Sequence, residues 1–186
     1  MCRTRTIGSV FEESDGNLFG RGNLSFTTIN LPRLGIKHGI ATGKRQSANM
    51  KAFYLELDDI IDLCTEQLLD RYNIQKNKKV KNFPFLMGQK VWFGSEKLDW
   101  NDTVEDVIKH GTLSIGFIGL AETLIALTGK HHGESDEIQQ LGLEIITHMR
   151  KRMDQAMDEY NFCLLYTSDA ADDTPCVDLG GRRIIK

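Results

Sequence analysis

The sequence lacks several features that would assign it directly to a class of protein. Its cysteines form no Cys-x-x-Cys pair, and the residues after Met1 do not resemble a signal peptide, so neither a disulfide framework nor a zinc site is indicated. The longest stretch without Asp, Glu, Lys or Arg, residues 110–121, is too short and too rich in glycine to cross a bilayer. We therefore expect a cytoplasmic protein with no membrane partner.

The charge of the whole chain is close to balanced. A net charge of −3 over 186 residues gives no polyanion-binding signature, so no nucleic-acid partner is expected. Residues 1–51, however, carry eight Lys or Arg residues against Glu12, Glu13 and Asp15. This segment is either a solvated basic face or a face directed toward a triphosphate. With 40% hydrophobic and 26% charged residues, the chain has the composition of one globular domain.

Two stretches near the beginning of the sequence have the pattern of a functional site. Residues 24–31 alternate as a strand that follows a glycine turn at Gly20 and Gly22 and is ended by Pro32. The alternation puts two sets of side chains on opposite faces: Leu24, Phe26 and Thr28 on one, and Ser25, Thr27 and Ile29 on the other. The stretch Cys2-Arg3-Thr4-Arg5 precedes this strand, which predicts a thiol on a loop beside a strand end rich in amide and guanidinium groups.

Residues 34–45 contain three glycines and no helical periodicity, so we expect a loop there. Residues 39–44 resemble a phosphate-binding loop. Their glycines are one residue too close, however, and Arg45 stands where Ser or Thr would hold magnesium. We do not assign a phosphate-binding loop to this segment.

Two long amphipathic helices are predicted, over residues 47–72 and 136–160, with Ser47 as the N-cap of the first and Ser135 or Asp136 as that of the second. Cys64 falls on the first apolar stripe, so we interpret it as a core residue. Each stripe repeats at helical spacing: Met50, Phe53, Leu57, Ile60, Cys64 and Leu68 in the first helix, and Ile138, Leu141, Ile145, Met149, Met153, Ala156 and Tyr160 in the second.

The segment between the two long helices contains weaker signals. Residues 82–88 contain Pro84 within an apolar run, which predicts an edge strand or the beginning of one, and residues 89–93 predict a short strand with Trp92. Asp102 or Thr103 is expected to cap a short helix that runs through Ile108. We interpret this segment as scaffold.

The run from His110 to Glu122 is apolar and rich in small residues, among them Ser114, Gly116 and Gly119. It predicts a buried strand followed by a helix that ends at Gly129. Its glycines either present backbone N–H groups to an anion or allow the strand and helix to pack closely, and both can hold together. His110 is most simply a core residue bonded to backbone. No metal is assigned to the His131-His132 pair, because nothing nearby supplies further ligands.

The chain changes character after Phe162. Residues 163–186 resemble the translation of sequencing-adapter DNA at the end of a fragmentary gene. We expect this tail to be foreign and disordered, and we assign no role to Cys163, Cys176 or the Gly180-Gly181 pair.

Several motifs, in this order, resemble those of the anaerobic (class III) ribonucleoside-triphosphate reductases. They are Cys2-Arg3-Thr4-Arg5, the stretch from Arg21-Gly22-Asn23 to Pro32-Arg33, Asn82-Phe83-Pro84-Phe85-Leu86, and the run from His110 to Glu122. The resemblance implies that residues 1–162 are part of a catalytic barrel domain. It predicts an α/β fold, a fragment of the ten-stranded barrel of glycyl-radical enzymes, with both long helices packed outside.

The resemblance also implies roles for individual residues. Cys2 would be the thiyl radical that abstracts the ribose 3′ hydrogen, and Asn23 would be a polar group beside the substrate or the reductant. Substrate-binding groups would be Arg3, Arg21 and Arg33, with Ser114 and Gly116 contacting the ligand at the glycine-rich turn.

Relatives of this family depend on parts that this sequence does not contain. These are a glycyl radical installed by an S-adenosylmethionine iron–sulfur activase, a cysteine-ligated zinc site and a nucleotide-binding regulatory domain. Formate or a thiol redoxin supplies electrons, and the full-length enzyme is expected to be a homodimer. The isolated chain is therefore expected to be inactive. Two alternatives stay open: another glycyl-radical enzyme related to formate lyases, and a non-catalytic nucleotide-binding module.

Overall fold

The computed structural model describes residues 22–160 and the backbone of residues 164–168. Cys2, Arg3 and Arg21 lie outside the described residues. The elements, in chain order, are β1 (Asn23–Asn30), α1 (Leu31–His38), α2 (Met50–Lys76), α3 (Glu105–Ile108), β2 (Thr112–Ile118), α4 (Leu120–Thr128), α5 (Asp136–Tyr160) and β3 (Leu164–Ser168). Short 3₁₀ turns occur at Val80–Asn82 and Ser95–Lys97.

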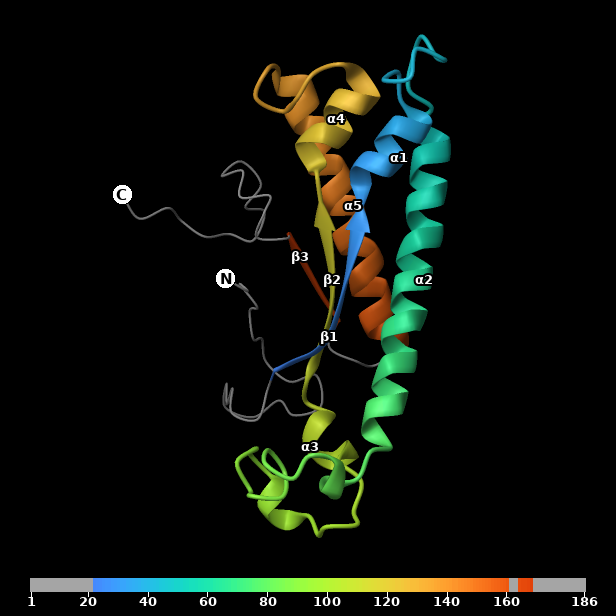
Figure 1. Ribbon diagram of the computed structural model, residues 1–186. Coiled ribbons are helices and arrows are strands. Elements are labelled where there is room, and N and C mark those ends of the chain that lie inside the picture. Colours follow the sequence, from blue (N-terminus) through green and yellow to red (C-terminus); the bar gives the residue numbers. More distant parts are fainter. Residues whose placement is uncertain (1–21, 161–163, 169–186) are drawn as a thin grey trace, which may run out of the picture.

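The three strands form a parallel sheet in the order β1-β2-β3 (Figure 1). Helices α1 and α2 connect β1 to β2, and α4 and α5 connect β2 to β3. Parallel neighbours need crossover connections of this kind, which place helices over a face of the sheet. The mixed α/β class expected from the sequence is confirmed, and the three described strands are a much smaller sheet than the expected barrel.

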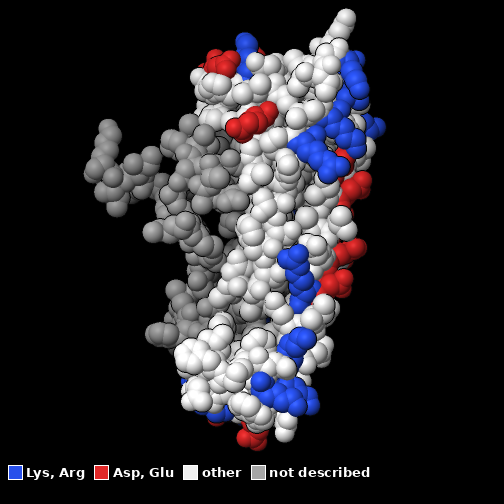
Figure 2. Space-filling view, viewed as in Figure 1, with Lys and Arg blue, Asp and Glu red and all other residues white. Residues whose placement is uncertain are grey.

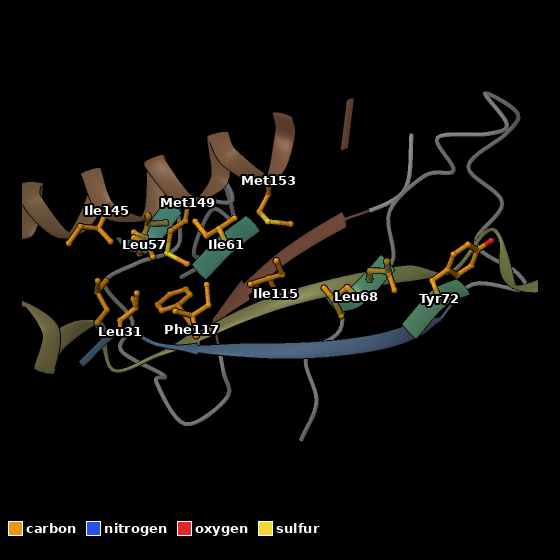
Figure 3. Packing of buried hydrophobic residues seen from close by; sticks show 14 of the residues in the cluster. Leu31, Leu57, Ile61, Leu68, Tyr72, Ile115, Phe117, Ile145, Met149 and Met153 are labelled. Atoms are coloured by element: carbon orange, nitrogen blue, oxygen red, sulfur yellow. The ribbon is translucent and has the colours of Figure 1, made fainter. Parts of the chain in front are cut away.

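The hydrophobic core lies between one face of this sheet and the two long helices (Figure 3). Ile115 and Phe117 of β2 are 0% and 4% exposed. They face apolar side chains of both long helices: Leu57, Ile61 and Leu68 from α2, and Ile145, Met149 and Met153 from α5. Burial of this apolar surface is the main force that holds the helices to the sheet.

The two predicted apolar stripes match this core to different degrees. In α5, Ile145, Met149 and Met153 are buried as predicted, whereas Tyr160 is 43% exposed. In α2, Phe53, Leu57 and Leu68 are buried as predicted. Between Leu57 and Leu68 the buried residues are Ile61 and Thr65, each one position later than the predicted Ile60 and Cys64. Ile60 and Cys64 therefore lie at the edge of the core, half-buried.

The beginnings of the first two helices differ from the sequence prediction. Helix α1 replaces the loop expected after Pro32; it begins because the Asn30 side chain accepts a hydrogen bond from the Arg33 N–H (3.2 Å). The N-cap of α2 is Asn49 rather than Ser47, with Oδ1 3.1 Å from the N–H of Ala52. In both cases an asparagine satisfies a free N–H of the first turn.

The strands predicted within residues 82–93 are wrong, because this segment forms turns. A Cβ at Gly88 would lie 2.4 Å from the Pro84 carbonyl oxygen, so the chain folds back on itself here instead of extending. Helix α3 ends at Ile108 as expected. It begins after Val104 without a side-chain cap, so the predicted caps Asp102 and Thr103 are also wrong.

The expected disorder of residues 163–186 does not hold for residues 164–168. These form β3, in which Leu164 pairs with Leu113 and Ser168 pairs with Phe117. Cys163 and residues 169–186, including Cys176, lie outside the described residues, so the foreign origin of the tail stays a prediction there. Among the helices that the structure describes, none is long and apolar enough to cross a membrane.

Candidate functional site

The sheet has a second face, opposite the one that α2 and α5 cover. Paired residues of parallel strands lie on the same face, and Phe26 pairs with Ser114 while Thr28 pairs with Gly116. Asn23 pairs with Thr112, which lies two residues before Ser114 in β2 and therefore on the same face. We call this face the polar face and define it by Asn23, Phe26, Thr28, Thr112, Ser114 and Gly116. The structure thus brings together Asn23, Ser114 and Gly116, which the sequence analysis selected from two distant stretches.

Two oxygen atoms on the polar face are buried and lack a hydrogen-bond partner among the described residues. They are Asn23 Oδ1 and Ser114 Oγ. The Ser114 residue is 1% exposed, so water does not solvate it freely. Leaving such a group unsatisfied costs on the order of 1–3 kcal/mol, and buried polar groups normally have a partner. Both oxygens are therefore suited to a ligand or to a protein segment that completes this face.

The two glycines of the predicted glycine-rich turn have different environments. Gly116 lies within the sheet, paired with Thr28 on one side and Thr167 on the other. Gly119 precedes α4 with a φ of +72°, and a Cβ there would lie 2.2 Å from Pro32 Cγ. Close packing between the beginnings of α1 and α4 therefore requires glycine at residue 119. Helix α4 ends at Gly129, as predicted, with a φ of +85°.

Arg33 does not join the polar-face residues. It is exposed in the first turn of α1, beyond the carboxyl end of β1, whereas Asn23 begins that strand. At about 3.3 Å per residue, the length of the strand separates the two. The same end of the molecule carries exposed Lys37, Lys44, Arg45 and Lys51, and Figure 2 shows Lys and Arg side chains gathered there.

This basic end contains an internal ion-pair cluster. Lys37 Nζ and His38 Nε2 each lie 2.6 Å from Glu56 Oε2, and Arg45 donates to the Lys37 carbonyl. Hydrogen bonds from Lys37 and then His38 lower the pKa of Glu56. The cluster joins the end of α1 to the first turns of α2, so part of the positive charge already has a structural role.

A second ion-pair network joins the two long helices. His148 Nε2 lies 2.7 Å from Asp58 Oδ1, and Arg152 Nε lies 3.2 Å from the same oxygen. Arg152 also pairs with Asp62. This network could not be predicted from the sequence, because its partners are at least 90 residues apart and no local pattern connects them.

The remaining candidate residues do not form a reactive centre in the described part of the chain. Burial raises the pKa of the Cys64 thiol, so this half-buried residue at the edge of the core is not an activated thiolate. His131 Nε2 pairs with Glu134 at 3.2 Å, and His110 lies half-buried just before β2. Within residues 22–160, the His, Cys, Asp and Glu side chains form no group of three that could hold a metal ion.

These features define a class of protein: an α/β chain with a parallel sheet. Long helices cover one face of the sheet, and mostly small or polar residues form the other. Comparison with known families makes the assignment specific. Residues 1–168 match the family model described as anaerobic ribonucleoside-triphosphate reductase. The chain belongs to this family, as its motifs suggested.

Individual relatives carry the same name. The chain is 29% identical over 170 residues to the anaerobic ribonucleoside-triphosphate reductase of Salmonella typhimurium. The aligned region covers 88% of this chain and 22% of the relative. It is 28% identical over 170 residues to that of Escherichia coli, with the same two coverages. For the enzyme of enterobacteria phage T4, identity is 32% over 171 residues, covering 89% of this chain and 26% of the relative. The chain thus spans about a quarter of the length of these relatives.

Proposed function

We propose that this chain is part of an enzyme that reduces ribonucleoside triphosphates to deoxyribonucleoside triphosphates, and that the polar face is directed toward its substrate. The observation that carries this proposal is the pair of buried, unpartnered oxygens of Asn23 and Ser114 on the face that the described helices leave uncovered. In a closed α/β barrel, one side of each strand packs against the outer helices and the other side points inward. The proposed setting is the ten-stranded barrel of glycyl-radical enzymes, with β1 and β2 as barrel strands.

The proposed chemistry requires a radical. The ribose 2′ hydroxyl leaves as water only after the unactivated C3′–H bond is broken, and no ordinary acid or base breaks that bond. A cysteine thiyl radical can, because the strengths of S–H and C–H bonds are close enough for reversible exchange. We assign this role to Cys2, which precedes β1 in the sequence and lies outside the described residues. Cys2 takes the 3′ hydrogen and returns it after water has left and two electrons have been supplied.

The polar face supplies groups suited to binding a ribose. The Asn23 side chain offers both an acceptor and a donor, and Ser114 offers a hydroxyl. Gly116, which pairs with Thr28, adds no side chain to this face. Arg3, Arg21 and Arg33 are proposed to contact phosphate or to position the Cys2 loop, because guanidinium groups bind phosphate oxygens in pairs.

The complete enzyme requires partners and groups beyond this chain. We propose a glycyl radical in the full-length protein, installed by an S-adenosylmethionine iron–sulfur activase, and formate or a thiol redoxin as the electron donor. A homodimer and a cysteine-ligated zinc site are further expectations for the full-length enzyme. The 186-residue chain alone is expected to be inactive.

The test uses the full-length protein, restored from the source DNA and activated under anaerobic conditions. Each ribonucleoside triphosphate is supplied to the wild type and to the Cys2→Ser and Cys64→Ser variants. We expect deoxynucleotide from the wild type and from Cys64→Ser, because Cys64 lies on α2 at the edge of the core and not on the polar face, and none from Cys2→Ser. Equal product from Cys2→Ser would exclude the assigned role of Cys2. Nucleotide binding without product in the activated wild type would favour a non-catalytic nucleotide-binding module.

A further inference from the structure

Side chains of α2 hold the outer edge of β1. Strand β1 is at the edge of the described sheet, so the backbone groups on its outer side have no strand partner there. Gln75 Nε2 donates to the Leu24 carbonyl (3.2 Å), and Arg71 Nη1 donates to the Phe26 carbonyl (3.1 Å). Arg71 and Gln75 are four residues apart, so they lie on one side of the helix and reach alternate carbonyls of the strand.

These contacts lie where β1 is least well held by its neighbour strand. The pairing register with β2 shifts between Asn23 and Ser25, which leaves Leu24 without a partner in the ladder. A shift of this kind bends the strand and changes the direction of adjacent side chains. Arg71 Nη1 also lies 3.3 Å from Ser25 Oγ. Ser25 is the first paired residue after the shift, and Asn23 is the last one before it. The backbone from Leu24 to Phe26 is thus held by side chains of α2 as well as by the pairing of Ser25 and Phe26 with β2, and among the described residues Leu24 depends on the α2 contact alone.

We propose that Arg71 and Gln75 are positioning residues that hold the irregular beginning of β1 so that the Asn23 side chain points at the substrate. This inference rests on the proposed function for the role of Asn23. Neither residue is on the polar face, so both act through the strand. A guanidinium bonded to a carbonyl is a charge-assisted contact, which makes Arg71 the stronger of the two.

A double-mutant cycle in the activated full-length reductase tests this role. Arg71→Met removes the donor while keeping much of the apolar stem, and Gln75→Met removes the amide donor with a side chain of similar length and no charge. We expect the Gln75 substitution to lower kcat/KM about tenfold, the effect of losing one hydrogen bond, and Arg71→Met to lower it at least about tenfold, because Arg71 contacts both Phe26 and Ser25. In an Asn23→Ala background the same substitutions should cause no further loss, because the residue they position is gone. Losses that multiply in the double variants would overturn the proposal.

Two measurements separate positioning from general damage. The glycyl-radical content, measured by electron paramagnetic resonance, should equal that of the wild type in every variant. Arg71→Lys keeps one cationic donor and should restore part of the activity. The matched control is Arg150→Met, which removes an exposed arginine of α5 that pairs only distantly with Asp154, at 3.9 Å, and should leave kcat/KM unchanged. Loss of activity in this control equal to that of Arg71→Met would contradict a specific role.

Hydrogen exchange distinguishes failure of this inference from failure of the proposed function. In the full-length protein, Arg71→Met should speed amide exchange of the peptide that contains β1 and leave the α5 peptide unchanged. Unchanged exchange in β1 would overturn the positioning role whatever the activity. Faster exchange in β1 together with an inactive wild type would show that Arg71 holds β1 and would refute only the proposed reduction of nucleotides.

Discussion

Replacement of Gly119 by alanine should destabilise the fold at the point where α1 and α4 meet. Gly119 has a φ of +72°, and adding a Cβ to a left-handed residue costs about 1–2 kcal/mol. The new Cβ would also lie 2.2 Å from Pro32 Cγ, so the two helix beginnings must separate. Overpacking of this kind costs about 1–3 kcal/mol more. We therefore expect Gly119→Ala to lower the free energy of unfolding by about 2–5 kcal/mol.

Gly43 provides a matched control for this prediction. Its φ is +68°, nearly that of Gly119, but no atom lies within 4 Å of the position that a Cβ would occupy. Gly43→Ala therefore keeps the backbone cost of about 1–2 kcal/mol without the steric one. Urea unfolding followed by circular dichroism measures both variants. Equal destabilisation by the two substitutions would refute the close approach of Gly119 and Pro32 as the reason for glycine.

Three further predictions follow from single contacts. Ser114→Ala should leave stability in thermal unfolding unchanged or slightly raised, because it removes a buried hydroxyl without a described partner. The same substitution should lower the activity of the full-length enzyme. A large loss of stability would indicate a partner for Ser114 Oγ. Hydrogen bonds from Lys37 and His38 lower the pKa of Glu56. The stability that these contacts contribute is therefore fully present above the ordinary glutamate pKa of about 4.3, and it is lost as the pH falls through the lower pKa of the folded state. Glu56→Gln should therefore weaken the acid dependence of unfolding, and an identical pH profile would contradict the ion pair. Burial raises the pKa of the Cys64 thiol, so at about pH 8 it should react with iodoacetamide more slowly than a free cysteine, and its rate should rise with pH. Reaction at the rate of free cysteine would show that the thiol is exposed.

Much of the fold follows from local sequence patterns. Periodicity predicted α5 and most of α2, and alternation predicted β1, because burial of one face leaves a regular pattern in the sequence. Helix α1 was missed because Gly35 looks like a helix breaker, although it allows α1 to approach α4: a Cβ there would lie 3.0 Å from the Thr123 carbonyl oxygen. That contact joins distant parts of the chain, and no local pattern contains it.

The candidate site was predictable by residue type and not by arrangement. The amide of Asn23 and the small residues Ser114 and Gly116 stood out in the sequence, yet their common face depends on the register between two strands. The contacts of Arg71 and Gln75 with β1 join residues 45 and 51 positions apart and depend on where α2 packs. Arg33 matched the motif as well as Asn23 did, and only the structure separates the two along β1.

The most direct test of the proposed radical reduction is the fate of the hydrogen at the ribose 3′ carbon. The activated full-length enzyme is supplied with a ribonucleoside triphosphate that carries deuterium at this position, and the product is analysed by mass spectrometry. We expect slower turnover than with the unlabelled substrate and deuterium retained at the 3′ carbon of the deoxynucleotide, because Cys2 removes this atom and returns it. Deoxynucleotide formed at the same rate from both substrates, with the deuterium lost to water, would contradict the proposed role of this chain.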